Sequence, residues 1–297
     1  MRPAARDWIE CALARAVLMS LSMGPRGASE WLARRYTGLL DFLVPKLRRT
    51  SMRNLEMAMP ETGPDDRRRI VDGTFRSIAR TLVAVARFPS IHSGNVADWI
   101  RYDGLEHFHA ARARGRGVLF ATAHLGNWEL SAFAHALLTR PMHVVVRALD
   151  NRGLDALARR YRSMSGNFIV EKRDFARSIV RALKDNEAVG ILVDQNTSLS
   201  EGVFVDFFGI PACVGVSFAR LAARTGAAVI PGYAVWSESE GKYILEFQPP
   251  LFATGDERED TQSIQSALER AIRKYPDQWL WMHRRWKTRP PGEPPLY

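Results

Sequence analysis

The chain has 297 residues, of which 46% are hydrophobic and 25% are charged, which is enough for one large domain with a substantial core. Its net charge of +10 favours anionic partners such as acidic lipid surfaces, phosphorylated substrates or an acidic carrier protein. The charge is spread along the chain and no nucleic-acid-binding motif accompanies it, so nucleic acid is not an expected partner. The two cysteines, Cys11 and Cys213, lie far apart and indicate neither a disulfide framework nor a metal site.

The first part of the chain is predicted to be helical. Residues 1–60 should form helices with breaks at Gly24-Pro25 and at Pro45, because these residues interrupt a helix. A further helix should begin at Pro64, where acidic residues in the first turn complement the helix dipole, and should end near Phe88.

Residues 8–23 within this region are apolar but include Glu10 and Arg15. A charge near the centre of a bilayer span costs several kcal/mol, so we do not predict a transmembrane helix. No convincing cleavage site follows the stretch, which argues against a signal peptide. Two interpretations remain: a helix lying in the membrane interface, anchored by Trp8 and Trp31, or an amphipathic helix packed on the protein's own domain.

Apolar segments alternate with helical patterns from residue 117 onward, which is typical of an α/β domain. We expect a helical N-terminal region with membrane-surface attachment over 1–100, the α/β domain over 101–290 and a free tail over 291–297, all within one structural domain. Strands are predicted at 117–122, 142–147, 168–170, 188–193, 228–236 and 243–248, and helices at 126–138, 151–165, 174–185, 215–225 and 260–274.

The most informative motif is His124-Leu-Gly-Asn-Trp-Glu129, which directly follows the first of these strands. Residues five apart do not share a helix face, so the pair can meet only if His124 lies in the turn and Glu129 in the first turns of the helix. Gly126 and Asn127 supply turn and cap residues for that geometry. An imidazole oriented by a carboxylate is what a general base needs to activate a hydroxyl, although a buried structural histidine is the alternative.

This motif resembles the His-x4-Asp/Glu box of the glycerolipid and lysophospholipid acyltransferase superfamily, and its wording is closest to the late acyltransferases of bacterial lipid A biosynthesis. The resemblance continues in order through four further blocks and covers most of residues 100–290. It implies a central mixed sheet flanked by helices, with the active site at the strand ends. The further blocks begin at Val144, Gly190, Val203 and Tyr275.

The blocks supply further candidate site residues. Arg147 matches the arginine of the family's second box and is predicted to donate a hydrogen bond to the oxyanion of the tetrahedral intermediate. A phosphate contact or a salt bridge with Asp150 is the alternative. Asp194 and Gln195 match the family's Asp-Gln pair and would support the site or contact the acceptor, unless they only end a strand. Asn127 is added as a substrate contact.

The last two blocks carry aromatic and cationic residues. Alternate aromatics in residues 203–211 could line an acyl groove, but core packing is the alternative. Arg284 and Arg285 lie among tryptophans, as in an interfacial phosphate site, although a packed helix end with solvated charges would have the same pattern.

The resemblance therefore implies a membrane-associated O-acyltransferase at the cytoplasmic face of a bacterial inner membrane. A fatty acyl thioester, on acyl carrier protein or CoA, would be the donor, and a hydroxyl of a lipid A precursor, a phosphorylated glycolipid, the acceptor. His124 would act as the base and Glu129 would orient it, with no acyl-enzyme, metal or cofactor. The alternatives are acyl-CoA-dependent acylation of another glycolipid, such as a phosphatidylinositol mannoside, and a non-catalytic lipid-binding protein.

Overall fold

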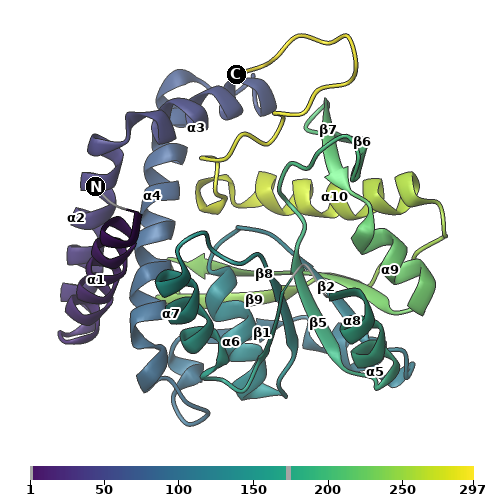
Figure 1. The fold of residues 1–297 in the computed structure, drawn as a ribbon, viewed down its shortest axis with the longest axis horizontal. Helices are drawn as coiled ribbons and strands as arrows, with labels where there is room; N and C mark the ends of the chain where they lie inside the picture. Colours follow the sequence, from purple (N-terminus) through teal and green to yellow (C-terminus); the bar gives the residue numbers. More distant parts are fainter. Residues whose placement is uncertain (1–2, 172–174) are drawn as a thin grey trace.

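A seven-stranded sheet forms the centre of the computed structural model, which describes residues 3–171 and 175–297 (Figure 1). The strand order is β1-β9-β8-β2-β5-β3-β4, and every neighbouring pair is parallel except β8 and β9. The α/β class and the mixed sheet predicted from the sequence are therefore confirmed. The strands are β1 (Ile100–Asp103), β2 (Val118–Thr122), β3 (His143–Val146), β4 (Phe168–Glu171), β5 (Ala188–Leu192), β8 (Ala228–Ser237) and β9 (Lys242–Phe247).

All six predicted strands coincide with observed strands to within one residue at each end. The prediction missed β1, and it missed the antiparallel hairpin of β6 (Gly202–Phe207) and β7 (Ile210–Gly215), which lies outside the main sheet. The hairpin buries Phe207 against Trp279 and Trp286 and Phe208 against Trp281, so these two aromatics of the block pack in the core. The core-packing alternative, rather than an acyl groove, is therefore the correct one.

Helices cover both faces of the sheet, as the buried strands of a parallel sheet require. Alternate residues of β2 show this: Phe120 packs with α5 (Leu105–Ala113) and α6 (Trp128–Leu138), whereas Leu119 packs on the opposite face. The opposite face is covered by α8 (Phe175–Lys184), α9 (Ser217–Thr225) and α10 (Glu257–Lys274). Helix α7 (Arg152–Ser163) lies beside α6. Residue 174, where we predicted one helix to begin, lies outside the described residues.

The N-terminal helices pack together at one side of the sheet (Figure 1). They are α1 (Pro3–Ser22), α2 (Arg26–Leu43), α3 (Pro45–Ala58) and α4 (Pro64–Arg87), and their boundaries confirm the predicted breaks at Gly24-Pro25 and Pro45. The long helix α4 contacts α1, α2, α3 and α6 and so joins this region to the rest of the fold. Among the helices that the structure describes, none has the length and apolar character needed to cross a bilayer.

The C-terminal segment closes the fold instead of hanging free. Trp279, Trp281 and Trp286 have no exposed surface and belong to one core cluster with α3 and α4. The tail was expected to be free from residue 291, but the hydroxyl of Tyr297 accepts a hydrogen bond from the backbone N–H of Trp286 (3.2 Å) and bonds to Asn54 (2.5 Å). That expectation is wrong, because the last residue is held by two hydrogen bonds.

Candidate active site

His124 lies in the turn between β2 and α6, as its position in the motif predicted. The turn is tight: Gly126 has φ of +65°, and a Cβ atom there would lie 2.0 Å from the carbonyl oxygen of Ala234. Asn127 then caps α6, since its Oδ1 accepts a hydrogen bond from the backbone N–H of Leu130 (3.0 Å). The cap is confirmed, but Asn127 is fully buried and offers no surface for the substrate contact that we predicted.

Asp194, rather than Glu129, holds the imidazole of His124. His124 Nδ1 lies 2.9 Å from Asp194 Oδ1, and the backbone N–H of His124 donates to Oδ2 at 2.9 Å. The two residues meet because β2 and β5 are parallel neighbours, so the segments that follow them emerge at the same edge of the sheet. Asp194 was placed near the site from the sequence, but its role as the direct partner was not foreseen.

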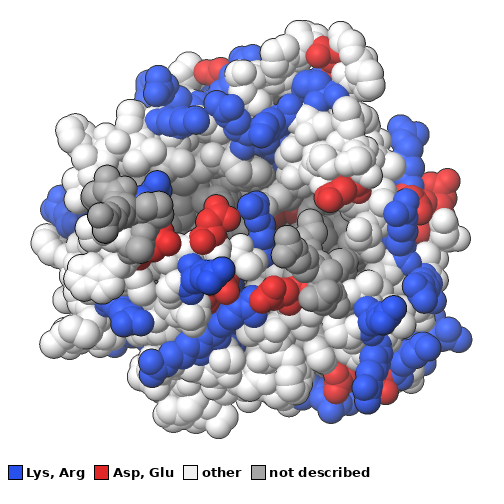
Figure 2. Space-filling model, viewed as in Figure 1, with Lys and Arg blue, Asp and Glu red and all other residues white. Residues whose placement is uncertain are grey.

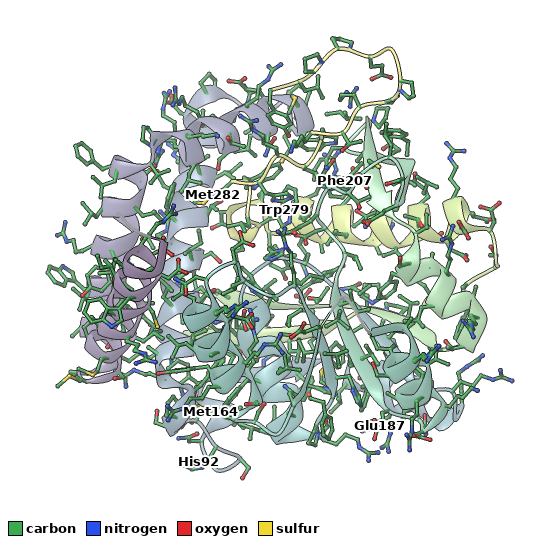
Figure 3. The ribbon with its side chains drawn as sticks, in the orientation of Figure 1. His92, Met164, Glu187, Phe207, Trp279 and Met282 are labelled. Carbon is green, nitrogen blue, oxygen red and sulfur yellow. The ribbon has the colours of Figure 1, made fainter. Side chains whose placement is uncertain are left out.

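Two residues of the C-terminal segment complete the surroundings of Asp194. The indole N–H of Trp279 donates to Oδ2 at 2.9 Å, and Nε2 of His283 lies 3.2 Å from the backbone carbonyl oxygen of Asp194. Figure 3 shows Trp279 beside Phe207 in the interior, where their rings are 5.9 Å apart. The carboxylate thus accepts three hydrogen bonds and has no exposed surface.

Glu129 forms an ion pair with Arg162 of α7 in place of the predicted bond to His124. Arg162 donates two hydrogen bonds to the two carboxylate oxygens, at 2.8 and 2.5 Å. The prediction of a His124–Glu129 hydrogen bond is therefore wrong, because α7 offers Glu129 a guanidinium and Asp194 already occupies Nδ1 of His124. Glu129 still acts on His124 through its charge, which raises the pKa of the imidazole.

The charges around His124 favour its protonated form, and those around Asp194 favour the carboxylate. Burial alone would lower the pKa of His124, but the charge and hydrogen bond of Asp194 outweigh burial and the pKa is raised. Burial alone would raise the pKa of Asp194, yet His124 and the Trp279 indole hold it well below its usual range. Since Asp194 is ionised, Nδ1 of a neutral His124 must carry the proton, which leaves Nε2 as an acceptor.

An apolar cavity of about 70 Å³ lies beside this pair, between α6 and the sheet. Trp128 joins the two features, since its ring lines the cavity and meets the ring of His124 at a centroid distance of 4.9 Å. Glu129 and Arg162 also line the cavity, so the ion pair forms part of its wall. The deeper wall is apolar and includes Phe120, Phe133, Met142, Val145 and Phe247. A histidine oriented by a carboxylate next to an apolar cavity is suited to act as a base on a substrate with a hydrocarbon chain.

Comparison with known proteins now assigns the family. A family model described as "Bacterial lipid A biosynthesis acyltransferase" matches residues 4–288. The chain belongs to this family. It is therefore an acyltransferase, and the resemblance noted from the sequence is confirmed.

Curated relatives of this acyltransferase agree with the match. The lipid A biosynthesis palmitoleoyltransferase of Escherichia coli (strain K12) is 29% identical over 248 residues, covering 82% of this chain and 80% of the relative. The lipid A biosynthesis lauroyltransferase of the same organism is 29% identical over 252 residues, with the same coverage. The phosphatidylinositol mannoside acyltransferase of Mycolicibacterium smegmatis is 25% identical over 278 residues, covering 92% of this chain and 88% of the relative.

The remaining predicted site residues of the acyltransferase lie outside the His124–Asp194 pair. Arg147 follows β3 with 83% of its side chain exposed and lies 3.9 Å from Asp150, as in the salt-bridge alternative. Gln195 and Arg284 are exposed, and the guanidinium of Arg284 lies over the ring of Tyr297 at 5.6 Å.

Arg285 is the clearest correction among these residues. It has no exposed surface and donates to Gln265 (3.1 Å) and to the carbonyl oxygen of Cys213 (3.3 Å). Burial lowers the pKa of Arg285 to about 10. An arginine enclosed in this way supports the core behind the site and cannot reach a phosphate from solvent.

Trp279, His283 and Arg162 also belong to the site and were not predicted as its members. Trp279 and His283 lie in the C-terminal block that begins at Tyr275, but their contact with Asp194 depends on tertiary structure. The parallel pairing of β2 and β5 was the one signal that could have placed Asp194 directly against His124.

Proposed function

We propose that this acyltransferase moves a fatty acyl chain from a thioester to a hydroxyl of a lipid A precursor, with His124 as general base. The observation that carries the proposal is the 2.9 Å contact between His124 Nδ1 and a fully buried, ionised Asp194, next to an apolar cavity. This contact fixes the tautomer that leaves Nε2 free to accept a proton, and 14% of the His124 side chain is exposed to an incoming substrate.

The reaction needs no nucleophile from the protein. His124 Nε2 takes the proton of the acceptor hydroxyl while its oxygen attacks the thioester carbonyl, and a tetrahedral oxyanion forms. The oxyanion collapses, the C–S bond breaks, and the imidazolium returns the proton to the leaving thiolate. Asp194 stabilises the imidazolium throughout, because it is a carboxylate held close to Nδ1.

The cavity between α6 and the sheet would hold the acyl chain of the donor. Its deep wall consists of Phe120, Phe133, Phe247 and other apolar side chains, so burial of a hydrocarbon chain there is favourable. Trp128 links the cavity to His124, which would bring the thioester carbonyl at the head of the chain to the base.

Charge supports an acyl carrier protein as donor and a phosphorylated glycolipid as acceptor. The chain carries a net charge of +10, and both partners are anionic. In Figure 2 basic side chains border the hollowed centre of the face, with acidic side chains between them. Arg147 and Arg284 are exposed arginines of the predicted set, and we assign them to phosphate contacts because a guanidinium binds phosphate in a bidentate manner.

Helices α1 and α2 would attach the enzyme to the cytoplasmic face of the bacterial inner membrane. They expose several large apolar side chains, and Arg34 and Arg35 are exposed as well. The Arg35 guanidinium lies over the ring of Trp31 at 5.1 Å. Apolar and aromatic side chains mixed with arginine are typical of a helix that lies in a membrane interface. We call the following exposed residues of α1, α2 and the turn between them the apolar face: Trp8, Leu13, Met19, Met23, Trp31, Phe42 and Leu43.

A second acceptor is retained because the relative named phosphatidylinositol mannoside acyltransferase covers 92% of this chain. Purified enzyme should be incubated with lauroyl-acyl carrier protein or lauroyl-CoA and with either a tetra-acylated lipid A precursor or a phosphatidylinositol mannoside. Mass spectrometry should show the precursor heavier by one acyl group, and His124→Ala should abolish the gain while the protein stays folded. If only the phosphatidylinositol mannoside gains an acyl group, the acceptor is reassigned to that glycolipid. Lipid binding without any gain in mass would indicate a lipid-binding protein.

A further inference from the structure

The cavity wall contains a hydroxyl group that the reaction described above does not use. Thr122 is the last residue of β2, and its Oγ1 is buried with no hydrogen-bond partner among the residues that the structure describes. A buried hydroxyl normally has a partner, because leaving it unpaired costs free energy. Since Thr122 lines the cavity, a group of the substrate can supply that partner.

The position of Thr122 on the strand places it close to the base. It precedes His124 by two residues, so the Cα atoms of the two residues are at most about 7 Å apart. A base and an oxyanion donor on opposite sides of one tetrahedral carbon are separated by roughly two hydrogen bonds of about 3 Å each. Trp128 connects the two residues, because it lines the same cavity as Thr122 and its ring packs against the ring of His124.

We infer that the Thr122 hydroxyl donates a hydrogen bond to the oxyanion of the tetrahedral intermediate and is a further catalytic residue. The inference rests on the proposed acyl transfer. A donor that is buried and fixed on a strand stabilises developing charge better than one in water, because no solvent has to reorganise around it.

Arg147 and Arg162 are less suited to this role. Arg147 is 83% exposed, so solvent screens its charge. Arg162 lines the cavity, but it already donates two hydrogen bonds to Glu129. Among the cavity-lining residues that the structure describes, Thr122 therefore combines an unpaired hydrogen-bond donor with a place beside the base.

Thr122→Val tests the inference, because valine keeps the shape of threonine and removes the hydroxyl. We expect kcat to fall by about 100-fold to 1,000-fold, as for loss of one oxyanion donor, with little change in KM for the acyl donor. Thr122→Ser keeps the hydroxyl and should retain most of kcat. Thr225→Val is the matched control: it makes the same substitution on α9, outside the cavity, and should leave kcat unchanged.

Thermal unfolding of each variant shows that a low rate does not come from loss of the fold. An unchanged kcat in Thr122→Val would overturn the inference, and so would a loss confined to KM, which would make Thr122 a binding contact only. If the wild-type enzyme transfers no acyl group from either thioester, the proposed function fails instead. The two failures are thus distinguishable.

Discussion

The indole of Trp279 and the carboxylate of Asp194 are 85 residues apart in the chain, yet a 2.9 Å hydrogen bond joins them inside the core. The bond goes to the carboxylate oxygen Oδ2, while the other oxygen faces the ring of His124. The orientation of His124, the proposed base, therefore depends on a residue much further along the chain.

Trp279→Phe should destabilise the protein and slow the enzyme. The variant leaves one oxygen of a buried carboxylate short of a donor, and we expect the free energy of unfolding to fall by about 1–3 kcal/mol beyond the cost of the smaller ring. Trp286→Phe is the matched control, since Trp286 is equally buried but its indole nitrogen has no partner among the residues described. Equal losses in urea denaturation would mean that the bond to Asp194 contributes nothing.

Asp194→Asn should reduce kcat by about 100-fold to 10,000-fold, because the amide neither selects the correct tautomer of His124 nor stabilises the imidazolium. In the wild type the pKa of His124 is raised, and only the neutral ring accepts a proton, so kcat/KM should rise with pH through that raised pKa to a plateau. Without the carboxylate of Asp194, burial lowers the pKa of His124, and the rise in kcat/KM should move to lower pH. A pH–rate profile that stays in place would remove Asp194 from the site.

Glu129→Gln should have a milder effect, about tenfold in kcat, which corresponds to about 1.4 kcal/mol. The substitution removes a charge that raises the pKa of His124 and leaves the nearby Arg162, which lowers it, so the pH profile should shift toward acid. The double variant Glu129→Gln/Arg162→Gln removes both charges, so its pH profile should shift back toward that of the wild type. A loss in Glu129→Gln as large as that in Asp194→Asn would restore Glu129 as the orienting acid.

His135 should make the protein less stable in acid. Burial lowers its pKa to about 3, while the unfolded chain has an ordinary histidine near pKa 6.5, so the unfolded state binds the extra proton between these values. Stability is therefore complete above about pH 6.5 and is lost as the pH falls, by about 2 kcal/mol at about pH 5. Urea denaturation of wild type and His135→Phe at about pH 7 and about pH 5 checks this: the variant should lose about 2 kcal/mol less.

The apolar face of α1 and α2 should determine binding to lipid vesicles. Trp8→Ser/Phe42→Ser removes two side chains that are 72% and 80% exposed, and we expect sedimentation with anionic vesicles to fall by about tenfold or more. Phe252→Ser is the control, since Phe252 is also exposed (51%) but lies outside α1 and α2. Equal effects of the two changes would argue against attachment through this face.

Much of the fold followed from local patterns in the sequence. We predicted correctly the strands of the main sheet that contain apolar runs, and the helix breaks at Gly24-Pro25 and Pro45. Both features depend on neighbouring residues in the sequence. Strand β1 was missed because charged residues alternate with Ile100 and Tyr102, so it lacks the apolar run that marks the equally short strands β3 and β4.

The site was only partly predictable, because its contacts join distant segments. The sequence placed His124 in its turn, but it could not decide between Glu129, five residues away, and Asp194, seventy residues away in the chain. That choice depends on which strands become neighbours and on Arg162, which binds Glu129 from another helix. Arg285 was predicted on the surface for a similar reason. Consecutive basic residues in a sequence are expected to be exposed to solvent, and only the tertiary structure shows that Arg285 is buried.

The segment that carries Trp279 and His283 also bears on how the site assembles during folding. His124 and Asp194 follow neighbouring parallel strands and can meet once the sheet forms, but Oδ2 of Asp194 gains its indole donor only when this later segment packs against the core. Local unfolding of the segment should therefore loosen the carboxylate that holds the ring of His124 while the sheet stays intact.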